Sequence, residues 1–159
     1  MTLRRPGPVD LVVDTSAILA LALDEPTAAA VQTALASATE PVMSAATSVE
    51  LHIVARARFG PAGADAVRTI LDAADVVTMP VDSIQTELAT AAWDRFGRGN
   101  HAAGLDYGDC FSYALARHLD APLLCVGNDF PLTDVAVIDL SAPDPPPTAQ
   151  GRPQRDHER

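Results

Sequence analysis

Four acidic residues from separate parts of the chain have the types and places that could do chemistry. Asp14 directly follows the apolar run VDLVV, and Asp129 follows the apolar run PLLCV. Glu50 lies in a predicted helix, and Asp109 lies in the first turn of another. Because ligands of parallel α/β sheets bind beyond the carboxyl ends of the strands, we expect these carboxylates to meet at that edge.

Each of these acids also has an ordinary structural explanation. Asp14 and Asp109 suit helix starts, where a carboxylate accepts from free N–H groups and favours the helix dipole. Asp129, in the sequence GND, suits a turn. Asp134 is a weaker alternative to Asp129 as the fourth acid. It is the set of four, and no single member, that favours a shared site.

The place of Glu50 carries the most weight. We expect the inward face of its helix to be an apolar stripe at spacings of three and four, formed by Ala46, Val49, Ile53, Val54 and Ala57. Glu50 lies within this stripe. A carboxylate on an inward face is costly unless a cation compensates it. The pattern therefore predicts a bound metal ion, an inward arginine, or a place for Glu50 at the edge of the stripe.

Converging carboxylates repel one another unless a hard cation neutralises them. The set contains no cysteine or histidine, so it favours Mg²⁺ or Mn²⁺ over zinc. Such sites serve in-line displacement at phosphorus. Thr15, Ser16 and Asn128 lie next to two of the acids and could bind backbone groups, water or substrate.

The charge of the chain limits how it could hold a nucleic acid. The net charge is −10, and the 11 cationic residues are all arginines. This argues against a binder that works through a basic face, but not against an enzyme whose metal supplies positive charge locally. The residues that could grip a substrate are scattered: Arg4, Arg5, Arg56, Arg58, Arg95, Arg98 and His101. Without lysine, the chain cannot be a P-loop or Schiff-base enzyme.

The element pattern predicts one α/β domain. Strands are expected at 9–13, 41–44, 76–81, 122–126 and 135–140, and helices at 15–23, 26–38, 45–59, 63–74, 82–97 and 106–119. Strands separated by helices imply a three-layer α/β/α sandwich with a central, mostly parallel sheet. Residues 1–8 are expected to be an extension and 141–159 a proline-rich, disordered tail around the domain at 9–140.

The remaining signals indicate a cytoplasmic protein. Cys110 and Cys125 lie in apolar stretches and are expected to be buried free thiols. No apolar run reaches the roughly 18 residues that a membrane span needs, and the N-terminus does not resemble a secretory signal. We therefore expect no association with a membrane.

The sequence resembles the PIN-domain nucleases, and most closely the VapC toxins of bacterial type II toxin–antitoxin systems. The stretches that carry the resemblance cover 9–140: VVDTSAILALALDEP, SVELHIVARARFG, HAAGLDYGDCFSYALA and LLCVGNDFPLTDV. The resemblance implies that Asp14, Glu50, Asp109 and Asp129 are the catalytic and metal-binding acids. Asp106 stands where close relatives often carry asparagine, which adds an acid near the site.

The resemblance also implies an activity and partners. It implies a PIN-like fold and a Mg²⁺- or Mn²⁺-dependent endoribonuclease that leaves 5′-phosphate and 3′-hydroxyl ends on a tRNA or rRNA. The implied partners are a VapB-type antitoxin and a second copy in a homodimer. Two other classes stay open: a phosphoryl-handling, magnesium-binding domain, and a catalytically silent module whose acidic pocket binds a basic partner.

Overall fold

The computed structural model describes residues 9–141, and its centre is a sheet of four parallel strands in the order β3-β2-β1-β4. The strands are β1 (Leu11–Val13), β2 (Pro41–Ser44), β3 (Val77–Met79) and β4 (Leu123–Leu124). The helices are α1 (Thr15–Ala22), α2 (Ala28–Ser37), α3 (Ala45–Ala73), α4 (Ser83–Phe96), α5 (Tyr107–Leu119) and the short 3₁₀ helix η1 (Phe130–Leu132). The predicted extension, with Arg4 and Arg5, and the predicted tail beyond Ser141 lie outside the described residues.

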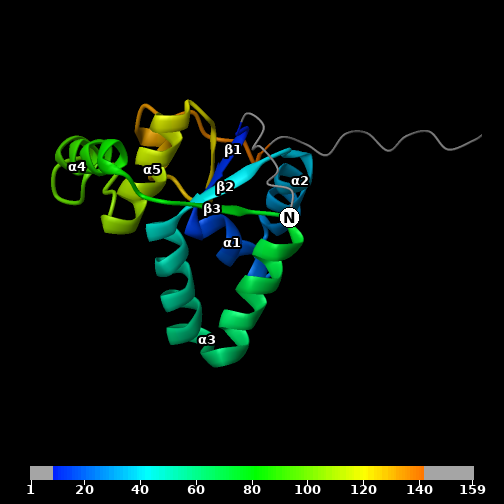
Figure 1. Cartoon of the computed structure of the whole chain (residues 1–159). Coiled ribbons are helices and arrows are strands. Elements are labelled where there is room, and N and C mark those ends of the chain that lie inside the picture. Colours follow the sequence, from blue (N-terminus) through cyan, green and yellow to red (C-terminus); the bar gives the residue numbers. More distant parts are fainter. Residues whose placement is uncertain (1–8, 142–159) are drawn as a thin grey trace, which may run out of the picture.

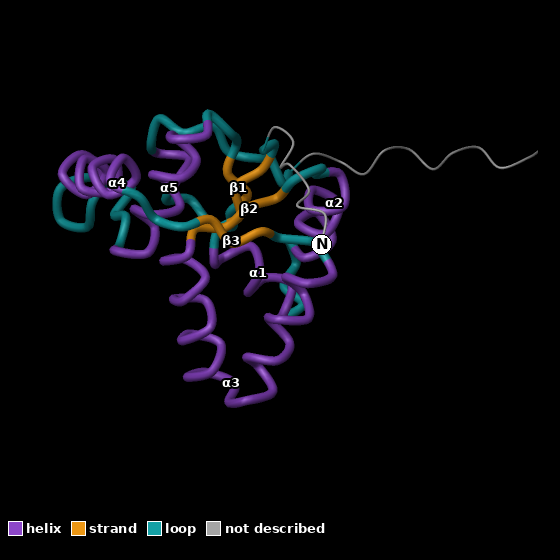
Figure 2. The backbone as a smooth tube through the Cα atoms, viewed as in Figure 1, coloured by secondary structure: helices purple, strands orange, loops and turns teal. Residues whose placement is uncertain are grey.

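Side chains alternate between two apolar layers, one on each face of the sheet. Val12 and Val42 pack into a cluster with residues of α4 and α5. Their neighbours Leu11, Val13 and Met43 pack into a second cluster with residues of α1, α2 and α3. Figure 1 shows α4 and α5 on one side of the strands and α1 on the other, and the strands lie between the helical layers in Figure 2. The predicted three-layer α/β/α sandwich is confirmed.

Helix α3 consists of two arms that meet at a sharp kink, which lies between the helices predicted at 45–59 and 63–74. Gly60 has φ 67° and ψ −161°, a conformation that glycine adopts without the penalty of a side chain. Pro61 follows and begins the second arm. In Figure 1 the two arms form a V that projects away from the sheet. None of the helices in residues 9–141 is long and apolar enough to cross a membrane.

The predicted last strand at 135–140 is wrong. This segment makes only one isolated parallel bridge, between Leu123 and Val137. Two hydrogen bonds hold it there, from Leu123 N–H to the Ala136 carbonyl and from Ile138 N–H to the Leu123 carbonyl, both 2.9 Å long. Since β4 is only two residues long, it offers this neighbour too little backbone for a ladder. The apolar residues of the segment instead pack beside the two core clusters.

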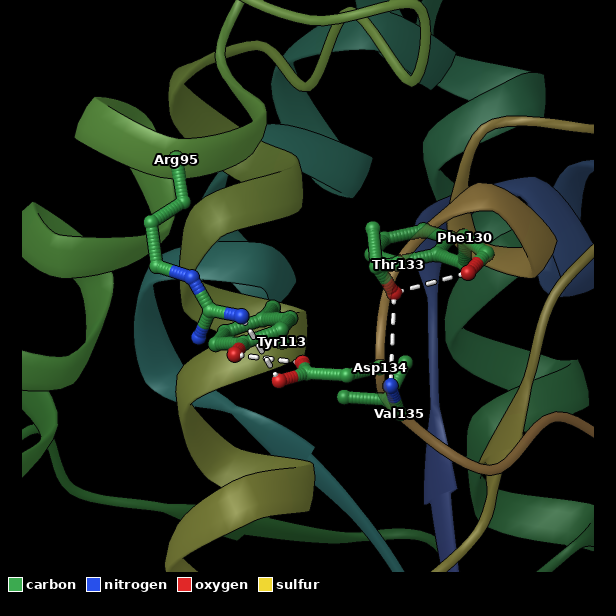
Figure 3. A network of polar contacts seen from close by, with 6 residues as sticks. All are labelled: Arg95, Tyr113, Phe130, Thr133, Asp134 and Val135. Carbon is green, nitrogen blue, oxygen red and sulfur yellow. Dashed lines mark hydrogen bonds and ion pairs between the residues drawn. The ribbon is translucent and has the colours of Figure 1, made fainter.

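A polar network fixes the segment after η1 to helices α4 and α5 (Figure 3). The buried Tyr113 donates its hydroxyl to Asp134 Oδ1 at 2.7 Å, and Arg95 Nη2 donates to Asp134 Oδ2 at 3.0 Å. The charge of Arg95 and these hydrogen bonds hold the pKa of Asp134 below its ordinary value against the opposing effect of burial. Arg95 also lies over the Phe96 ring, 4.6 Å from its centroid. Asp134 is therefore a structural acid, and Arg95 is engaged with the protein.

We predict that Asp134→Ala destabilises the fold by about 1–3 kcal/mol, because it leaves the buried Tyr113 hydroxyl without its acceptor. The double variant Asp134→Ala/Tyr113→Phe should lose less than the sum of the two single variants, since it removes both members of the hydrogen bond. Urea unfolding followed by circular dichroism measures these differences. Asp139→Ala removes an exposed acid of the same segment and should leave the urea midpoint close to that of the wild type. Strict additivity of the two variants would contradict the prediction.

Candidate active site

Asp14 occupies the centre of the candidate site, at the carboxyl end of strand β1. Its side chain is 3% exposed and both of its oxygens accept hydrogen bonds. Oδ2 accepts from the backbone N–H of Ser16 at 3.0 Å and from the Ser16 hydroxyl at 2.7 Å, and Oδ1 accepts from the Ser112 hydroxyl at 2.6 Å. The predicted role as helix cap and the predicted place at the strand end are therefore both correct, and the donors fix the orientation of the carboxylate.

The hydroxyls beside Asp14 connect the neighbouring elements. The Ser16 hydroxyl accepts from the backbone N–H of Val126, just after β4, at 3.0 Å. The Thr15 hydroxyl donates to Glu50 Oε2 at 3.1 Å. The Ser16 hydroxyl therefore binds a backbone group, one of the partners expected from the sequence, whereas the Thr15 hydroxyl binds a second acid.

Glu50 reaches the site, although the stripe expected around it is wrong. Val49 and Ile53 are 60% and 62% exposed, whereas the buried positions on this arm of α3 are Thr47, Leu51 and Ala55. Glu50 lies beside this buried stripe and is half-buried against Thr15 and helix α5. Its pKa is raised by burial, and the charges of Asp106 and Asp14 raise it further. The sequence placed the acid correctly but assigned the wrong face of the helix to the core.

Asp109 enters the site from the first turn of α5, where it forms a reciprocal capping box with Asp106. Asp106 N–H donates to Asp109 Oδ2 at 2.9 Å, and Asp109 N–H donates to Asp106 Oδ1 at 3.0 Å. Burial, together with the charges of Asp14, Asp106 and Glu50, raises the pKa of Asp109 to about 7. On α5, Ala114 and Leu115 are buried, whereas Tyr107 is 75% exposed.

The other predicted residues lie around this cluster. Asp129 and Asn128 are exposed in the loop before η1, and Asp129 makes no side-chain cap bond there. The charge of Asp129 contributes, after those of Asp14 and Asp109, to the raised pKa of Cys125. Arg56, Arg58, Arg98 and His101 are exposed.

Cys110 and Cys125 are buried free thiols, as predicted. Burial and the nearby carboxylates raise the pKa of Cys110 to about 11 and that of Cys125 to about 12. Both thiols therefore stay protonated near neutral pH, which removes them as nucleophiles, since the thiolate is the reactive form.

The sequence analysis did not identify three residues of the site: Ser112, Thr47 and Gly108. Ser112 and Thr47 are fully buried, and their hydroxyls lie 3.1 Å apart. A Cβ added at Gly108 would overlap the carboxylate of Glu50. The available signal was a glycine and a serine four residues apart on an otherwise apolar helix, which could have marked a face that meets polar groups.

The four acids Asp14, Glu50, Asp106 and Asp109 thus repel one another electrostatically, and no cation of the described residues pairs with them. In residues 9–141 the ion pairs are Arg95–Asp134 and His118–Asp82, neither of which involves Asp14, Glu50, Asp106 or Asp109. Uncompensated carboxylates in an all-oxygen donor set, two of which (Glu50 and Asp109) have a raised pKa, fit a hard divalent cation in charge and chemistry. Within the same residues no group of three or more candidate ligands lies close enough together to hold a metal ion.

Comparisons with known proteins identify the family of this chain. The PIN domain family model matches residues 11–136. Ribonuclease VapC of Mycolicibacterium smegmatis is 44% identical over 128 residues, which cover 80% of this chain and 99% of that protein. Ribonuclease VapC28 of Mycobacterium tuberculosis is 46% identical over 126 residues, or 79% of this chain and 95% of that protein.

Solved structures support the fold. The crystal structure of Mycobacterium tuberculosis VapC20, described as a sarcin-ricin loop cleaving toxin, has a TM-score of 0.65 at 20% identity and covers 81% of this chain and 98% of its own. VapBC-1 from nontypeable Haemophilus influenzae gives 0.64 at 17% identity, with 83% and 98% covered. The match of the family model and the identity of the curated relatives show that the chain belongs to the PIN-domain family and, within it, to the VapC ribonucleases.

Proposed function

We propose that this VapC-family chain is a divalent-metal-dependent endoribonuclease and the toxin of a toxin–antitoxin pair. It hydrolyses RNA phosphodiester bonds and leaves 5′-phosphate and 3′-hydroxyl ends. The observation that carries the proposal is the meeting of Asp14, Glu50, Asp106 and Asp109 at one edge of the sheet without a cation to compensate them. A bound Mg²⁺ or Mn²⁺ would supply the missing positive charge.

The acids have different tasks in this proposal. Asp14 and Asp109 would hold the ion, and the exposed Asp129, in the loop before η1, would be a third ligand. A bound cation would lower the pKa of water and offset the charge that develops at phosphorus. Glu50, held by the Thr15 hydroxyl, orients the attacking water and accepts its proton. The donors on Asp14 keep its carboxylate from rotating, so it meets the ion without reorganisation.

The substrate is bound by few cations in an acidic protein. Arg56 and Arg58 are exposed on the first arm of α3, which also carries Glu50, and Arg98 is exposed after α4. We assign these arginines to phosphate groups of the RNA, whereas Arg95 is engaged with Asp134. Since only a few phosphates would be contacted, binding should depend weakly on salt.

We infer a VapB-type antitoxin as the cognate partner, in the cytoplasm, and a homodimer as the toxin's own assembly. The inference about the antitoxin is supported by fold neighbours described as VapBC-1 and as a toxin–antitoxin complex from Klebsiella pneumoniae. Because no ion pair within residues 9–141 compensates the site carboxylates, they favour a partner that brings cations to them.

The phosphoryl-acceptor alternative is disfavoured by the surroundings of Asp14. A carboxylate that is 3% exposed and hydrogen-bonded at both oxygens is poorly placed to attack a phosphate. A silent binding module would cleave no RNA. Cleavage that disappears with chelator and returns with Mg²⁺ or Mn²⁺ would therefore exclude this alternative.

We predict that Asp14→Asn and Asp109→Asn each lower RNA cleavage by at least about 100-fold, because each removes a negative charge that holds the ion. Asp129→Asn should have a smaller effect, since Asp129 is exposed and outside the cluster. Cleavage is measured on labelled total RNA with purified protein in Mg²⁺ and in EDTA. The control Asp139→Asn changes an exposed acid of the last segment and should cleave at the wild-type rate. Undiminished cleavage by a folded Asp14→Asn protein would refute the proposal.

We further predict that the metal-free protein loses stability as the pH rises from about 4 to about 7. The pKa of Asp109 is 3.8 in the unfolded chain and about 7 in the native state, so the native state binds more protons in this interval. Stability falls with rising pH wherever the native state is the more protonated one. Thermal unfolding in EDTA across this pH range measures the slope.

The variant Asp109→Asn tests the origin of this slope. It removes the titrating group, so its melting temperature in EDTA should fall less between pH 4 and pH 7 than that of the wild type. Saturating Mg²⁺ should flatten the wild-type slope as well, because a bound cation keeps the carboxylate ionised. Equal slopes for the metal-free wild type and Asp109→Asn would assign the effect to other groups.

A further inference from the structure

One face of helix α5 contacts the carboxylates that other elements bring to the site. Gly108 and Ser112 are four residues apart and therefore lie one turn apart on the same face. Gly108 contacts Glu50 of α3, and Ser112 contacts Asp14 at the end of β1. Asp109, between them in sequence, is carried by the same helix.

We propose that Gly108 and Ser112 are positioning residues, which set Glu50 and Asp14 relative to Asp109 so that the acids can share a divalent cation. This inference rests on the proposed function, since it assumes that the cluster binds an ion. Neither residue is acidic, so each acts through the carboxylate that it contacts.

Ser112 positions Asp14 through a directed chain of hydroxyls. The Ser112 hydroxyl is fully buried and donates its single proton to Asp14 Oδ1 at 2.6 Å, because a carboxylate only accepts. The Thr47 hydroxyl, 3.1 Å from Ser112 Oγ, must then be the donor of that second bond. The chain runs from Thr47 through Ser112 to Asp14, and each bond polarises the next. It ties α3, α5 and β1 together at Asp14.

Gly108 positions Glu50 because it has no side chain. A Cβ at this buried position would overlap Oε1, Oε2 and Cδ of Glu50, so the carboxylate lies where any other residue would place a side chain. Alanine is the better helix former, and Gly108 has no positive φ that would require glycine. The close approach of Glu50 is therefore the physical reason for glycine here.

The two contacts together fix the spacing of the acids. Thr15 holds one oxygen of Glu50 from the other side at 3.1 Å, and Ser16 holds Asp14 Oδ2. Each carboxylate is thus bounded by α1 and by α5. Residues that orient metal ligands in this way affect ion affinity by about 10- to 100-fold when they are replaced.

The test measures Mn²⁺ binding to the full chain without RNA, by the electron paramagnetic resonance signal of free Mn²⁺. Ser112→Ala should weaken binding by at least about 10-fold, and Thr47→Val should weaken it by a smaller factor. The matched control is Ser44→Ala, which removes a buried hydroxyl at the end of β2 that has no partner within residues 9–141. It should change the Mn²⁺ affinity less than twofold.

A double-variant cycle isolates the role of Gly108. Gly108→Ala should weaken Mn²⁺ binding, but less than Glu50→Ala does, because it displaces the same flexible carboxylate without removing it. In the Glu50→Ala background the clash is gone, so Gly108→Ala should have less than a twofold further effect. For RNA cleavage by Gly108→Ala and by Glu50→Ala, the fold-decrease in kcat should exceed the fold-increase in KM.

The outcomes separate this inference from the function on which it rests. Wild-type protein that binds no Mn²⁺ would overturn the proposed function and this inference with it. Wild-type affinity in the folded variants Ser112→Ala and Gly108→Ala would overturn the positioning role and leave the function standing. An equal effect of Gly108→Ala with and without Glu50 would assign that residue to packing. If Ser112→Ala does not fold, the nearly isosteric Thr47→Val decides whether the hydroxyl chain acts on the ion.

Discussion

Mutual repulsion between buried carboxylates is the constraint around which this molecule is built. Asp14 is nearly inaccessible to solvent, and burial and neighbouring charges raise the pKa of both Glu50 and Asp109. No ion pair in residues 9–141 relieves this charge. Such a cluster lowers the stability of the fold. The packing of the two apolar layers on either side of the sheet offsets this loss.

Neutral donors hold the acids in place instead of cations. Hydroxyls of Thr15, Ser16 and Ser112 donate to Glu50 and Asp14, and the backbone N–H of Asp106 donates to Asp109. Such donors fix the orientation of a carboxylate without removing its charge. The negative potential therefore stays available to a divalent cation, whereas an arginine at the same place would neutralise it.

Acids elsewhere in the chain show the contrasting arrangement. Asp134 is paired with Arg95 and accepts from Tyr113, and its pKa is lowered. It belongs to the network that fixes the last segment to α4 and α5 (Figure 3). The sequence could not separate Asp134 from Asp129 as a fourth acid, because the arginine that engages Asp134 lies 39 residues away in sequence.

Periodicity and helix caps are local properties, so the sequence by itself determined the order and type of nearly all elements and the sandwich. It also singled out Asp14, Glu50 and Asp109 as candidate site acids, whose catalytic role stays a prediction. Only the tertiary structure decided which face of α3 is buried and that the segment at 135–140 pairs with β4 at a single bridge. These outcomes depend on neighbours distant in sequence. The contacts of Ser112 and Gly108 are of the same kind, since they exist only where α5 packs against β1 and α3.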